Sequence, residues 1–271
     1  MPASLPGLAT INLRRGASNG AELRIELNRP ERMNAWDRQL GLDLLAAVEL
    51  AAVDDAMRAV TITGAGRAFS SGADLRDGFD PTPDGAPDVG ATLRERYHPT
   101  LTGIRRMPKP VLAAVNGPAV GIGCSLALAC DLVLAAESAY FLLAFVNIGL
   151  VPDGGASVFV PARAGAGRAA AMALLGDRVP AALGCDWGLV DRLAGDESFQ
   201  DEVDALAEHL ATGPTRAYAG AKQQLNARVY ARLDEQLELE ASLQQGLAGS
   251  GDFGEGVTAF LEKRAARFSG E

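Results

Sequence analysis

Short apolar runs alternate along the chain with stretches in which apolar residues recur every three to four positions. The first pattern is typical of strands and the second of amphipathic helices. Predicted strands lie at residues 9–13, 22–27, 59–63, 111–115, 132–136 and 140–141, and residues 187–191 lead into another. Predicted helices lie at residues 37–53, 91–107, 167–176, 181–189 and 198–211, with a further one from Cys124. The alternation predicts an α/β fold.

The last quarter of the chain has a helical pattern throughout. A repeat of apolar residues every four positions after Lys222 predicts one long amphipathic helix: Leu225, Val229, Leu233 and Leu237. Its apolar stripe must pack on this subunit or on a neighbour. We expect Gly249 to Gly256 to end this helix and residues 257–267 to form a last, basic helix. The chain therefore divides into a core, residues 1–200, and a C-terminal helical region, residues 201–271.

Two glycine turns each follow a buried strand. The strand at Val111–Val115 is broken by Asn116-Gly117-Pro118, and Gly121-Ile122-Gly123 then leads into the helix that includes Cys124. The N–H groups at a helix start lack partners and attract negative charge. The second turn, Gly66 to Leu75, follows the strand at residues 59–63. Either turn alone is equally consistent with a tightly packed connection, but together they can aim two donors at one carbonyl oxygen.

Composition excludes several classes of function. Apolar residues make up 48% of the chain and charged residues 22%, as in an ordinary soluble protein. The net charge of −9 argues against nucleic acid as a partner and leaves phosphates to local Lys or Arg groups. Three cysteines without metal-ligand spacing and only two histidines give no support for a metal site. No membrane-spanning or leader pattern is evident, so we expect a cytoplasmic protein.

The two turns, together with NRPERMNAW at residues 28–36, resemble the enoyl-CoA hydratase/isomerase (crotonase) family over nearly the whole chain. The resemblance implies a core of repeated ββα units in a superhelix and a C-terminal helical oligomerisation region. It implies homotrimers or dimers of trimers, and no cofactor other than the coenzyme A of the substrate. The oxyanion hole for the thioester oxygen would be formed by the backbone N–H groups of Ala73 and Ile122. The branched Ile122 side chain would narrow the acyl pocket.

The resemblance also implies contacts to the acyl-CoA. They fall on Arg29, Arg32, Ser71, Gly72, Asp74, Gly121, Ser125, Phe145, Phe260 and Lys263. For Arg29 and Arg32 the alternative is solvated surface charge, and for Asp74 it is a helix cap or turn. Lys263 is equally consistent with an exposed helix lysine, and Tyr97 and His98 either line the pocket or serve packing. Residues 78–89, rich in Gly, Pro and Asp, predict a loop that can act as a lid.

The carboxylates of the family's hydratases are missing. Aligned on the motifs, their two glutamates fall on Ser125 and Phe145. Hydration needs groups that orient water and move its proton, so their loss disfavours it. Asp153 remains, in a turn between Pro152 and Gly154. It is either a turn residue or the catalytic acid/base that the resemblance assigns to isomerases, where one carboxylate suffices. Nucleophilic attack by Asp153 is a further alternative.

Four stretches point within the family to isomerases of ring-containing acyl-CoA: residues 80–99, 144–155, 174–179 with 186–191, and 255–271. The leading hypothesis is therefore an acyl-CoA isomerase with Asp153 as acid/base. The second is an enoyl-CoA hydratase that uses Asp153 and a partner such as Asp74. The third is a non-catalytic acyl-CoA-binding protein.

Overall fold

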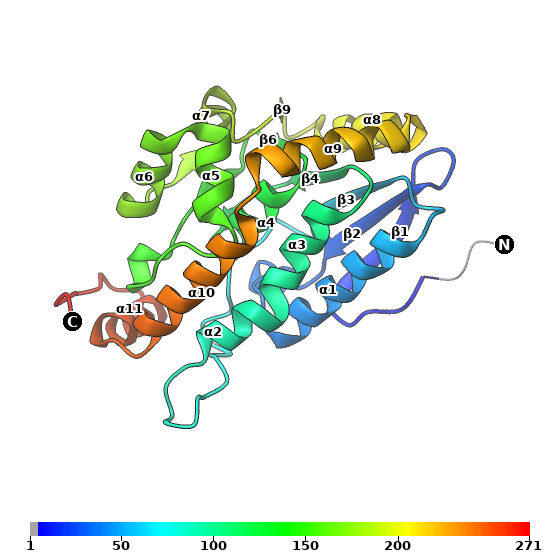
Figure 1. Ribbon diagram of the computed structural model, residues 1–271. Coiled ribbons are helices and arrows are strands. Elements are labelled where there is room, and N and C mark those ends of the chain that lie inside the picture. The colour runs from blue at the N-terminus through cyan, green and yellow to red at the C-terminus, as the bar shows by residue number, and fades with distance from the viewer. Residues whose placement is uncertain (1–4) are drawn as a thin grey trace.

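A computed structural model describes residues 5–271, and a six-stranded sheet lies at its centre (Figure 1). The strand order is β1-β2-β3-β4-β6-β9, with bounds Ile11–Gly16, Glu22–Leu27, Ala59–Gly64, Val111–Val115, Leu132–Ala136 and Arg192–Ala194. Strands β1 and β2 are antiparallel, and the other neighbours in this sheet are parallel. Parallel neighbours need crossover connections, which the helices provide. The α/β prediction is confirmed.

Helices surround this sheet, and after the last strand every element is a helix, from α8 to α11. The α-helices are α1 (Arg38–Val53), α2 (Val89–Thr92), α3 (His98–Arg106), α4 (Ile122–Ala129), α5 (Ala156–Ala164), α6 (Ala166–Leu175), α7 (Ala181–Trp187), α8 (Phe199–Thr212), α9 (Thr215–Val229), α10 (Leu233–Ala248) and α11 (Gly251–Glu262). Short 3-10 turns are η1 (Pro30–Arg32) and η3 (Val146–Ile148), and η2 (Leu93–Tyr97) is a π-helical segment.

Strand β4 shows why the sheet is covered on both faces. Val111, Ala113 and Val115 belong to the larger apolar core with residues of α1, α3 and α4. Leu112 and Ala114 belong to a second core, which residues of α8 complete. Consecutive side chains of a strand point to opposite faces, and an apolar strand buried on both faces is typical of parallel sheets. The apolar run predicted as a buried strand is therefore confirmed.

A smaller sheet includes the strand that ends at Val120, directly before the glycine turn at Gly121-Ile122-Gly123. Its order is β5 (Ala119–Val120), β7 (Tyr140–Leu142) and β8 (Val179–Pro180). Strands β5 and β8 have two residues each, which is too short for an alternating pattern, and the sequence analysis missed both. Helix α5 was also missed because it follows a glycine pair and contains Pro161, which is unusual inside a helix.

The first strand begins later than predicted, at Ile11 rather than Ala9. Thr10 lies outside the strand because its backbone N–H and its side-chain oxygen both donate to Asp43 on α1, at 2.8 Å each. The helix predicted at residues 91–107 is continuous but starts at Val89 and contains the π-helical segment η2. The helix predicted from Cys124 starts two residues earlier, at Ile122.

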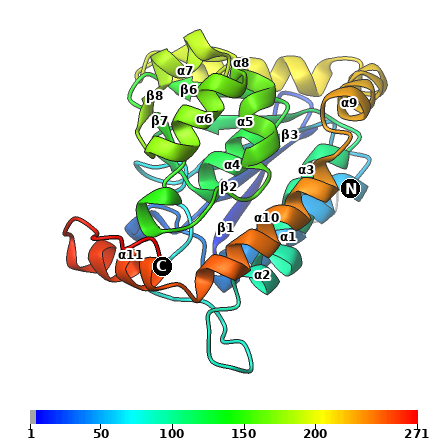
Figure 2. The ribbon, with the colours of Figure 1, turned by 60° about the vertical axis from the view of Figure 1, so that its left-hand side comes forward.

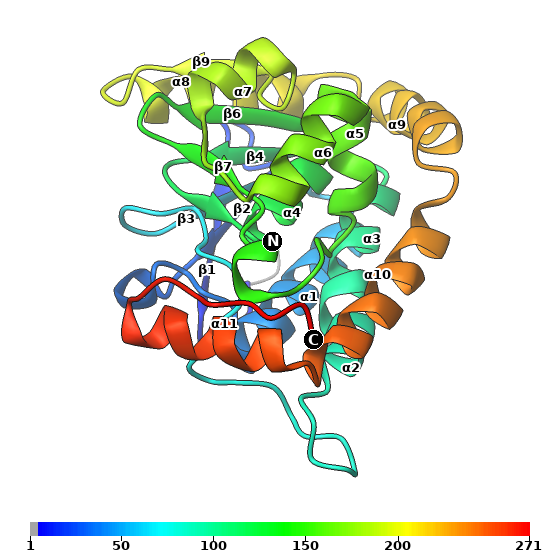
Figure 3. The same cartoon turned by 90° about the vertical axis from the view of Figure 1, so that its left-hand side faces the viewer.

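The single long helix predicted after Lys222 is wrong. The chain forms α9 and α10, with a turn at residues 230–232 between them, as Figure 3 shows. The turn is held by the Tyr230 ring, which packs edge-on against Phe159 and lies 4.6 Å from the Arg105 guanidinium. Leu225 in α9 is 57% exposed, whereas Leu233 in α10 is buried. The four-residue repeat therefore belongs to two helices in different environments.

The predicted end of the helix at Gly249 is confirmed, because α10 ends at Ala248 with Gly249 as its C-cap. The break is shorter than predicted and does not extend to Gly256. Helix α11 begins at Gly251, where the Ser250 side chain accepts a hydrogen bond from the Phe253 N–H. A Cβ at Gly256 would lie 2.6 Å from the backbone of Ile148, so this glycine permits close packing inside a helix. The helix ends at Glu262 rather than residue 267, because Lys263 takes a left-handed conformation.

Helix α10 lies beside α2, η2 and α5, so the C-terminal region packs on the core (Figures 1 and 2). Trimerisation through this region, and its separation from the core at residue 200, stay predictions. Residues 78–88 form an extended loop in which Pro81 bridges to Pro87, and its action as a lid also stays a prediction. In residues 5–271 no helix is long and apolar enough to span a membrane.

Candidate active site

The two glycine turns predicted from the sequence lie against each other. The Ser70 N–H donates to Pro118 O at 3.0 Å, and the Val120 N–H donates to Ser70 O at 2.9 Å. Gly72 has a φ of +93°, and a Cβ there would lie 3.0 Å from Val120 O. Gly121 has a φ of +54°, and a Cβ there would lie 3.7 Å from the Gly72 Cα. A side chain at Gly72 would press on the backbone of the other turn, whereas at Gly121 the positive φ, and not a lack of space, favours glycine.

This contact brings two free backbone donors to one cavity. Ala73 follows Gly72, and Ile122 follows Gly121 as the first residue of α4. Within residues 5–271 neither N–H is taken by a protein acceptor, and both residues line the cavity. The N-terminus of α4 adds the positive end of its dipole. The arrangement can stabilise an oxygen that gains negative charge.

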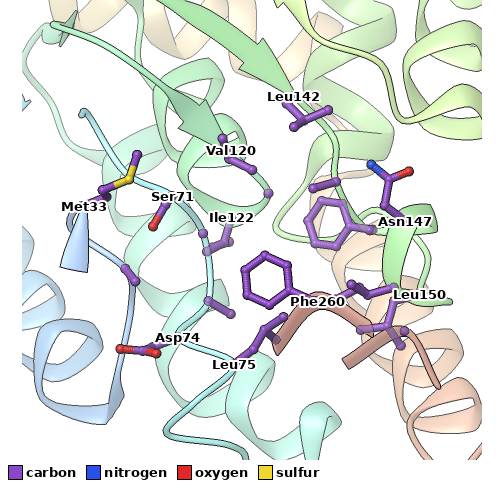
Figure 4. A pocket seen from close by; sticks show the side chains of 18 of the residues that line it. Met33, Ser71, Asp74, Leu75, Val120, Ile122, Leu142, Asn147, Leu150 and Phe260 are labelled. Atoms are coloured by element: carbon purple, nitrogen blue, oxygen red, sulfur yellow. The ribbon is translucent and has the colours of Figure 1, made fainter. Parts of the chain in front are cut away.

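The cavity has a volume of about 660 Å³. Figure 4 shows the Phe260 ring in it, between the side chains of Ile122 and Leu150, so α11 of the same chain forms one wall. The inner wall is apolar and includes Phe145, Leu93 and Tyr97, the last two from opposite ends of the π-helical segment η2. Arginines line the cavity as well: Arg32, Arg67, Arg76, Arg178 and Arg264. The site therefore combines an apolar interior with positive charge.

Asp153 lines this cavity and is 5% exposed. It lies in the turn before α5, whose glycines Gly154 and Gly155 have φ angles of +64° and +79°. The Ser125 hydroxyl donates to the Asp153 backbone O at 2.7 Å and fixes the turn to α4. On the side chain, Oδ2 accepts a hydrogen bond from Gln244 Nε2 at 2.8 Å, and Oδ1 is buried without a protein partner.

The pKa of Asp153 is raised well above its ordinary value of 3.8. Burial is the largest cause, because it disfavours the charged form. The negative charge of Glu240 raises the pKa of Asp153 further, and the hydrogen bond from Gln244 lowers it. A carboxyl group with a raised pKa exchanges protons nearer neutral pH, which suits a catalytic acid/base.

Glu240 and Gln244 were missed by the sequence analysis. Both lie on α10 and are buried, at 3% and 0% exposure. Glu240 accepts hydrogen bonds from the N–H groups of Gly155 and Ser157 at the start of α5. A signal was present in the sequence, since these two polar residues occupy positions in the apolar stripe of α10 that continues from Leu233 and Leu237. Polar residues in such a stripe must find buried partners.

Asp74 also lines the cavity but has a different environment. Its carboxylate forms a salt bridge with Arg29 at 3.2 Å, and Arg29 forms a second one with Asp37 at 3.0 Å. The Asp74 side chain is 9% exposed, and in Figure 4 it points away from Phe260 and toward the N-terminal segment. The interpretation of Arg29 as a solvated surface charge is wrong, because its guanidinium joins two carboxylates inside the loop structure.

The other predicted residues divide into two groups. Those that line the cavity are Arg32, Ser71, Gly72, Gly121, Phe145 and Phe260, together with Tyr97. Ser125, Lys263, Arg29 and His98 do not. Ser125 is fully buried and supports the backbone of Asp153. Lys263 is the C-cap that follows the last residue of α11, and the next residue, Arg264, lines the cavity instead. The sequence could not place Arg29 and Ser125 because periodicity does not reveal which loop a polar side chain meets.

The chain belongs to the enoyl-CoA hydratase/isomerase family, since the sequence model of that family matches residues 18–271. Members of this family act on acyl-CoA substrates. The chain is 41% identical over 250 residues to 1,2-epoxyphenylacetyl-CoA isomerase of Escherichia coli (strain K12), covering 92% of this chain and 95% of that protein. The predicted likeness to a ring-processing isomerase of the family is therefore confirmed.

Other relatives carry a different name. A probable enoyl-CoA hydratase of Rhodobacter capsulatus is 45% identical over 246 residues, covering 91% of this chain and 93% of that protein. The crystal structure of an enoyl-CoA hydratase from Mycobacterium avium subsp. paratuberculosis superposes with a TM-score of 0.87 at 39% identity, covering 97% of this chain and 100% of the other. The relatives establish the family and the crotonase-like fold and do not choose between isomerisation and hydration.

Proposed function

We propose that the protein is an acyl-CoA isomerase in which Asp153 is the acid/base. The observation that carries the proposal is the contrast among the acidic residues that line the cavity in residues 5–271: Glu31, Asp74 and Asp153. Glu31 is exposed, and Asp74 is paired with Arg29. Asp153 is buried at the cavity without a cationic partner, so its carboxyl group is the one suited to exchange a proton with a substrate.

The proposed reaction needs no second carboxylate. Asp153 removes a proton from a carbon of the acyl chain, and the electron pair moves to the thioester oxygen to give an enolate. The N–H groups of Ala73 and Ile122 hold that oxygen, and each well-aimed donor is worth about 3–4 kcal/mol of barrier. The protonated Asp153 then returns the proton to another carbon, and the double bond shifts. Acid/base action of this kind typically contributes about 10²–10⁴-fold in rate.

The arginines at the cavity account for binding of the coenzyme A phosphates in this proposal. Arg32, Arg67 and Arg178 are exposed and line the cavity, in a chain whose net charge is −9. The Arg178 guanidinium lies 4.7 Å from the Tyr140 ring, which orients it. Arg29 is not part of this proposal, because its two salt bridges already engage it.

The acyl group is proposed to contain a ring or an unsaturated chain. The similarity to 1,2-epoxyphenylacetyl-CoA isomerase supports this, as does the apolar inner wall that includes Phe145 and Leu93. The second candidate is hydration, which the similarity to a probable enoyl-CoA hydratase favours. Hydration through Asp153 and Asp74 is opposed by the Arg29–Asp74 salt bridge, which already engages the Asp74 side chain.

A paired assay tests the proposal. Purified protein is given a 3-enoyl-CoA, monitored for the shift to the conjugated 2-enoyl-CoA, and crotonyl-CoA, monitored for hydration. We expect the shift without hydration, and we expect Asp153→Asn to lower kcat for the shift by at least about 10²-fold while acyl-CoA binding, measured by calorimetry, persists.

Three other outcomes would contradict the proposal in different ways. Efficient hydration of crotonyl-CoA would favour the hydratase. Unchanged turnover by Asp153→Asn would remove Asp153 from the mechanism. Binding of several acyl-CoA thioesters, including epoxyphenylacetyl-CoA, without turnover of any of them would favour the non-catalytic protein.

A further inference from the structure

Two residues of helix α10, Glu240 and Gln244, hold the turn that contains Asp153 through four hydrogen bonds. Glu240 and Gln244 are four residues apart on α10 and therefore lie on the same face of the helix. Gln244 Nε2 donates to Val151 O at 2.6 Å and to Asp153 Oδ2 at 2.8 Å. Glu240 Oε2 accepts from the Gly155 N–H at 2.8 Å, and its Oε1 accepts from the Ser157 N–H at 3.1 Å. The contacts fall on both sides of Asp153.

The hydrogen bonds of Gln244 distinguish the two oxygens of Asp153. A side-chain amide nitrogen carries two hydrogens, and here one serves the backbone of Val151 and the other serves Asp153 Oδ2. Because the amide is anchored to the backbone, it fixes the plane of the carboxyl group as well as one of its oxygens. The remaining oxygen, Oδ1, has no protein partner within residues 5–271. It is the atom left free for a substrate.

Burial raises the pKa of Glu240, and the hydrogen bonds that it accepts from Ser157 and Gly155 favour its charged form. Its two oxygens accept from the N–H groups of the first turn of α5, where the dipole favours negative charge. Its negative charge acts on Asp153 at the same time. Gln244 and Glu240 therefore act on Asp153 in opposite directions: the amide favours the ionised carboxylate, and the second carboxylate favours the protonated form.

We propose that Gln244 is a positioning residue that makes Asp153 Oδ1 the proton-transferring oxygen, and that Glu240 is a second positioning residue that holds the same turn through the N–H groups of Gly155 and Ser157. This inference rests on the proposed acid/base function of Asp153. It assigns a role in the chemistry to α10, a helix that the sequence associates with oligomerisation. Neither residue touches the substrate in this proposal, and each acts through Asp153.

Substitutions of the two residues should shift the pH dependence of kcat in opposite directions. The base must be ionised, so the rate rises with pH through the pKa of Asp153. Loss of the Gln244 donor raises that pKa and moves the rising limb to higher pH. Loss of the Glu240 charge lowers it and moves the limb to lower pH. Tyr97 on η2 is a further titratable group near Asp153 in the described part of the chain, while α4 contributes the uncharged Ile122 and Ser125.

The test compares Gln244→Met, Glu240→Gln and the control Gln236→Met in the 3-enoyl-CoA shift. Methionine keeps the length of glutamine without its donor, and Gln236 lies on the same helix with only a 3.4 Å contact to Ser157 Oγ. We expect Gln244→Met to lower kcat at neutral pH about 10- to 100-fold with KM changed less than about twofold, and to move the limb up by about one pH unit. Glu240→Gln should move it down by a similar amount, and Gln236→Met should leave it in place.

The outcomes separate this inference from the proposed function. If Asp153→Asn abolishes the shift while Gln244→Met lowers kcat without moving the limb, or moves KM and kcat together, the positioning role is wrong and the function of Asp153 stands. If Asp153→Asn keeps full activity, both proposals fail. Glu240→Gln can loosen the turn, so its folding is checked by thermal unfolding. If Glu240→Gln unfolds, the pH–rate profile of Gln244→Met alone tests the inference. A profile whose rising part stays at the parent pH would overturn it.

Discussion

Asp74 and Asp153 are two aspartates of the same cavity, each within two residues of a glycine with positive φ, and yet their environments are opposite. Asp74 meets the Arg29 guanidinium at 3.2 Å, and the positive charge offsets the loss of water around its carboxylate. Asp153 meets no cation among residues 5–271, is buried, and lies near the like charge of Glu240. The comparison teaches that the partners of a carboxyl group, more than its place in a motif, determine whether it is suited to hold the fold or to exchange protons.

The two environments also come from different parts of the chain. The partner of Asp74 lies in the NRPERMNAW loop near the N-terminus, whereas the partners of Asp153 lie on α10 near the C-terminus. The first cluster ties two loops together through paired charges. The second leaves one carboxyl oxygen free at the cavity. Breaking each cluster should therefore have effects of opposite sign.

The largest effect on stability is expected from Asp74→Asn. It leaves the partly buried Arg29 with Asp37 as its single carboxylate partner, so we expect the free energy of unfolding to fall by about 2–3 kcal/mol. Urea unfolding measures this, and kcat for the 3-enoyl-CoA shift should stay near that of the parent protein. The control Asp80→Asn breaks an exposed salt bridge with Arg38 and should change stability by less than about 0.5 kcal/mol. A large loss of kcat in stable Asp74→Asn protein would place Asp74 in the chemistry.

Gly154→Ala tests the packing behind Asp153. A Cβ at Gly154 would lie 2.4 Å from Ile122 Cδ1, and the residue has a φ of +64°, so we expect a loss of about 1–3 kcal/mol. Ile122→Val removes the contacting methyl and should recover part of the loss, which a double-mutant cycle of urea unfolding measures. Gly167→Ala, where a Cβ meets nothing within 4 Å, is the control and should not destabilise the protein. Full additivity in the cycle would show that Ile122 does not set the space at this turn.

Asp153→Asn should stabilise the folded protein, by about 1 kcal/mol at neutral pH. Burial and Glu240 raise the pKa of Asp153, so the parent protein pays for ionisation in the folded state. Below the ordinary pKa of 3.8 the carboxyl group is protonated in both folded and unfolded chains, and the two proteins should then differ least. As pH rises through the raised pKa the advantage of Asp153→Asn should grow and then level off. Urea unfolding from pH 5 to 8 measures it, and a variant that is less stable throughout would contradict the raised pKa.

The sequence alone determined the strands of the larger sheet, the two glycine turns and the family, and it singled out Asp153 as the candidate acid/base. These features depend on local patterns: apolar residues that alternate or run together, glycines at left-handed φ, and motifs short enough to be read in one stretch. The apolar run at residues 111–115 and the turns at Gly72 and Gly121 are of this kind, and the structure has them as predicted.

Only the tertiary structure decided which polar side chains meet. It placed Gln244 91 residues from Asp153 in sequence and 2.8 Å away in space, turned Ser125 from a substrate contact into a support of the Asp153 backbone, and engaged Arg29 with Asp74. It also ended α9 at Val229, where Tyr230 packs on Phe159. The physical reason is common to all of them. A buried polar group needs a hydrogen-bond partner, and that partner can come from any part of the chain. A local sequence pattern therefore does not identify it.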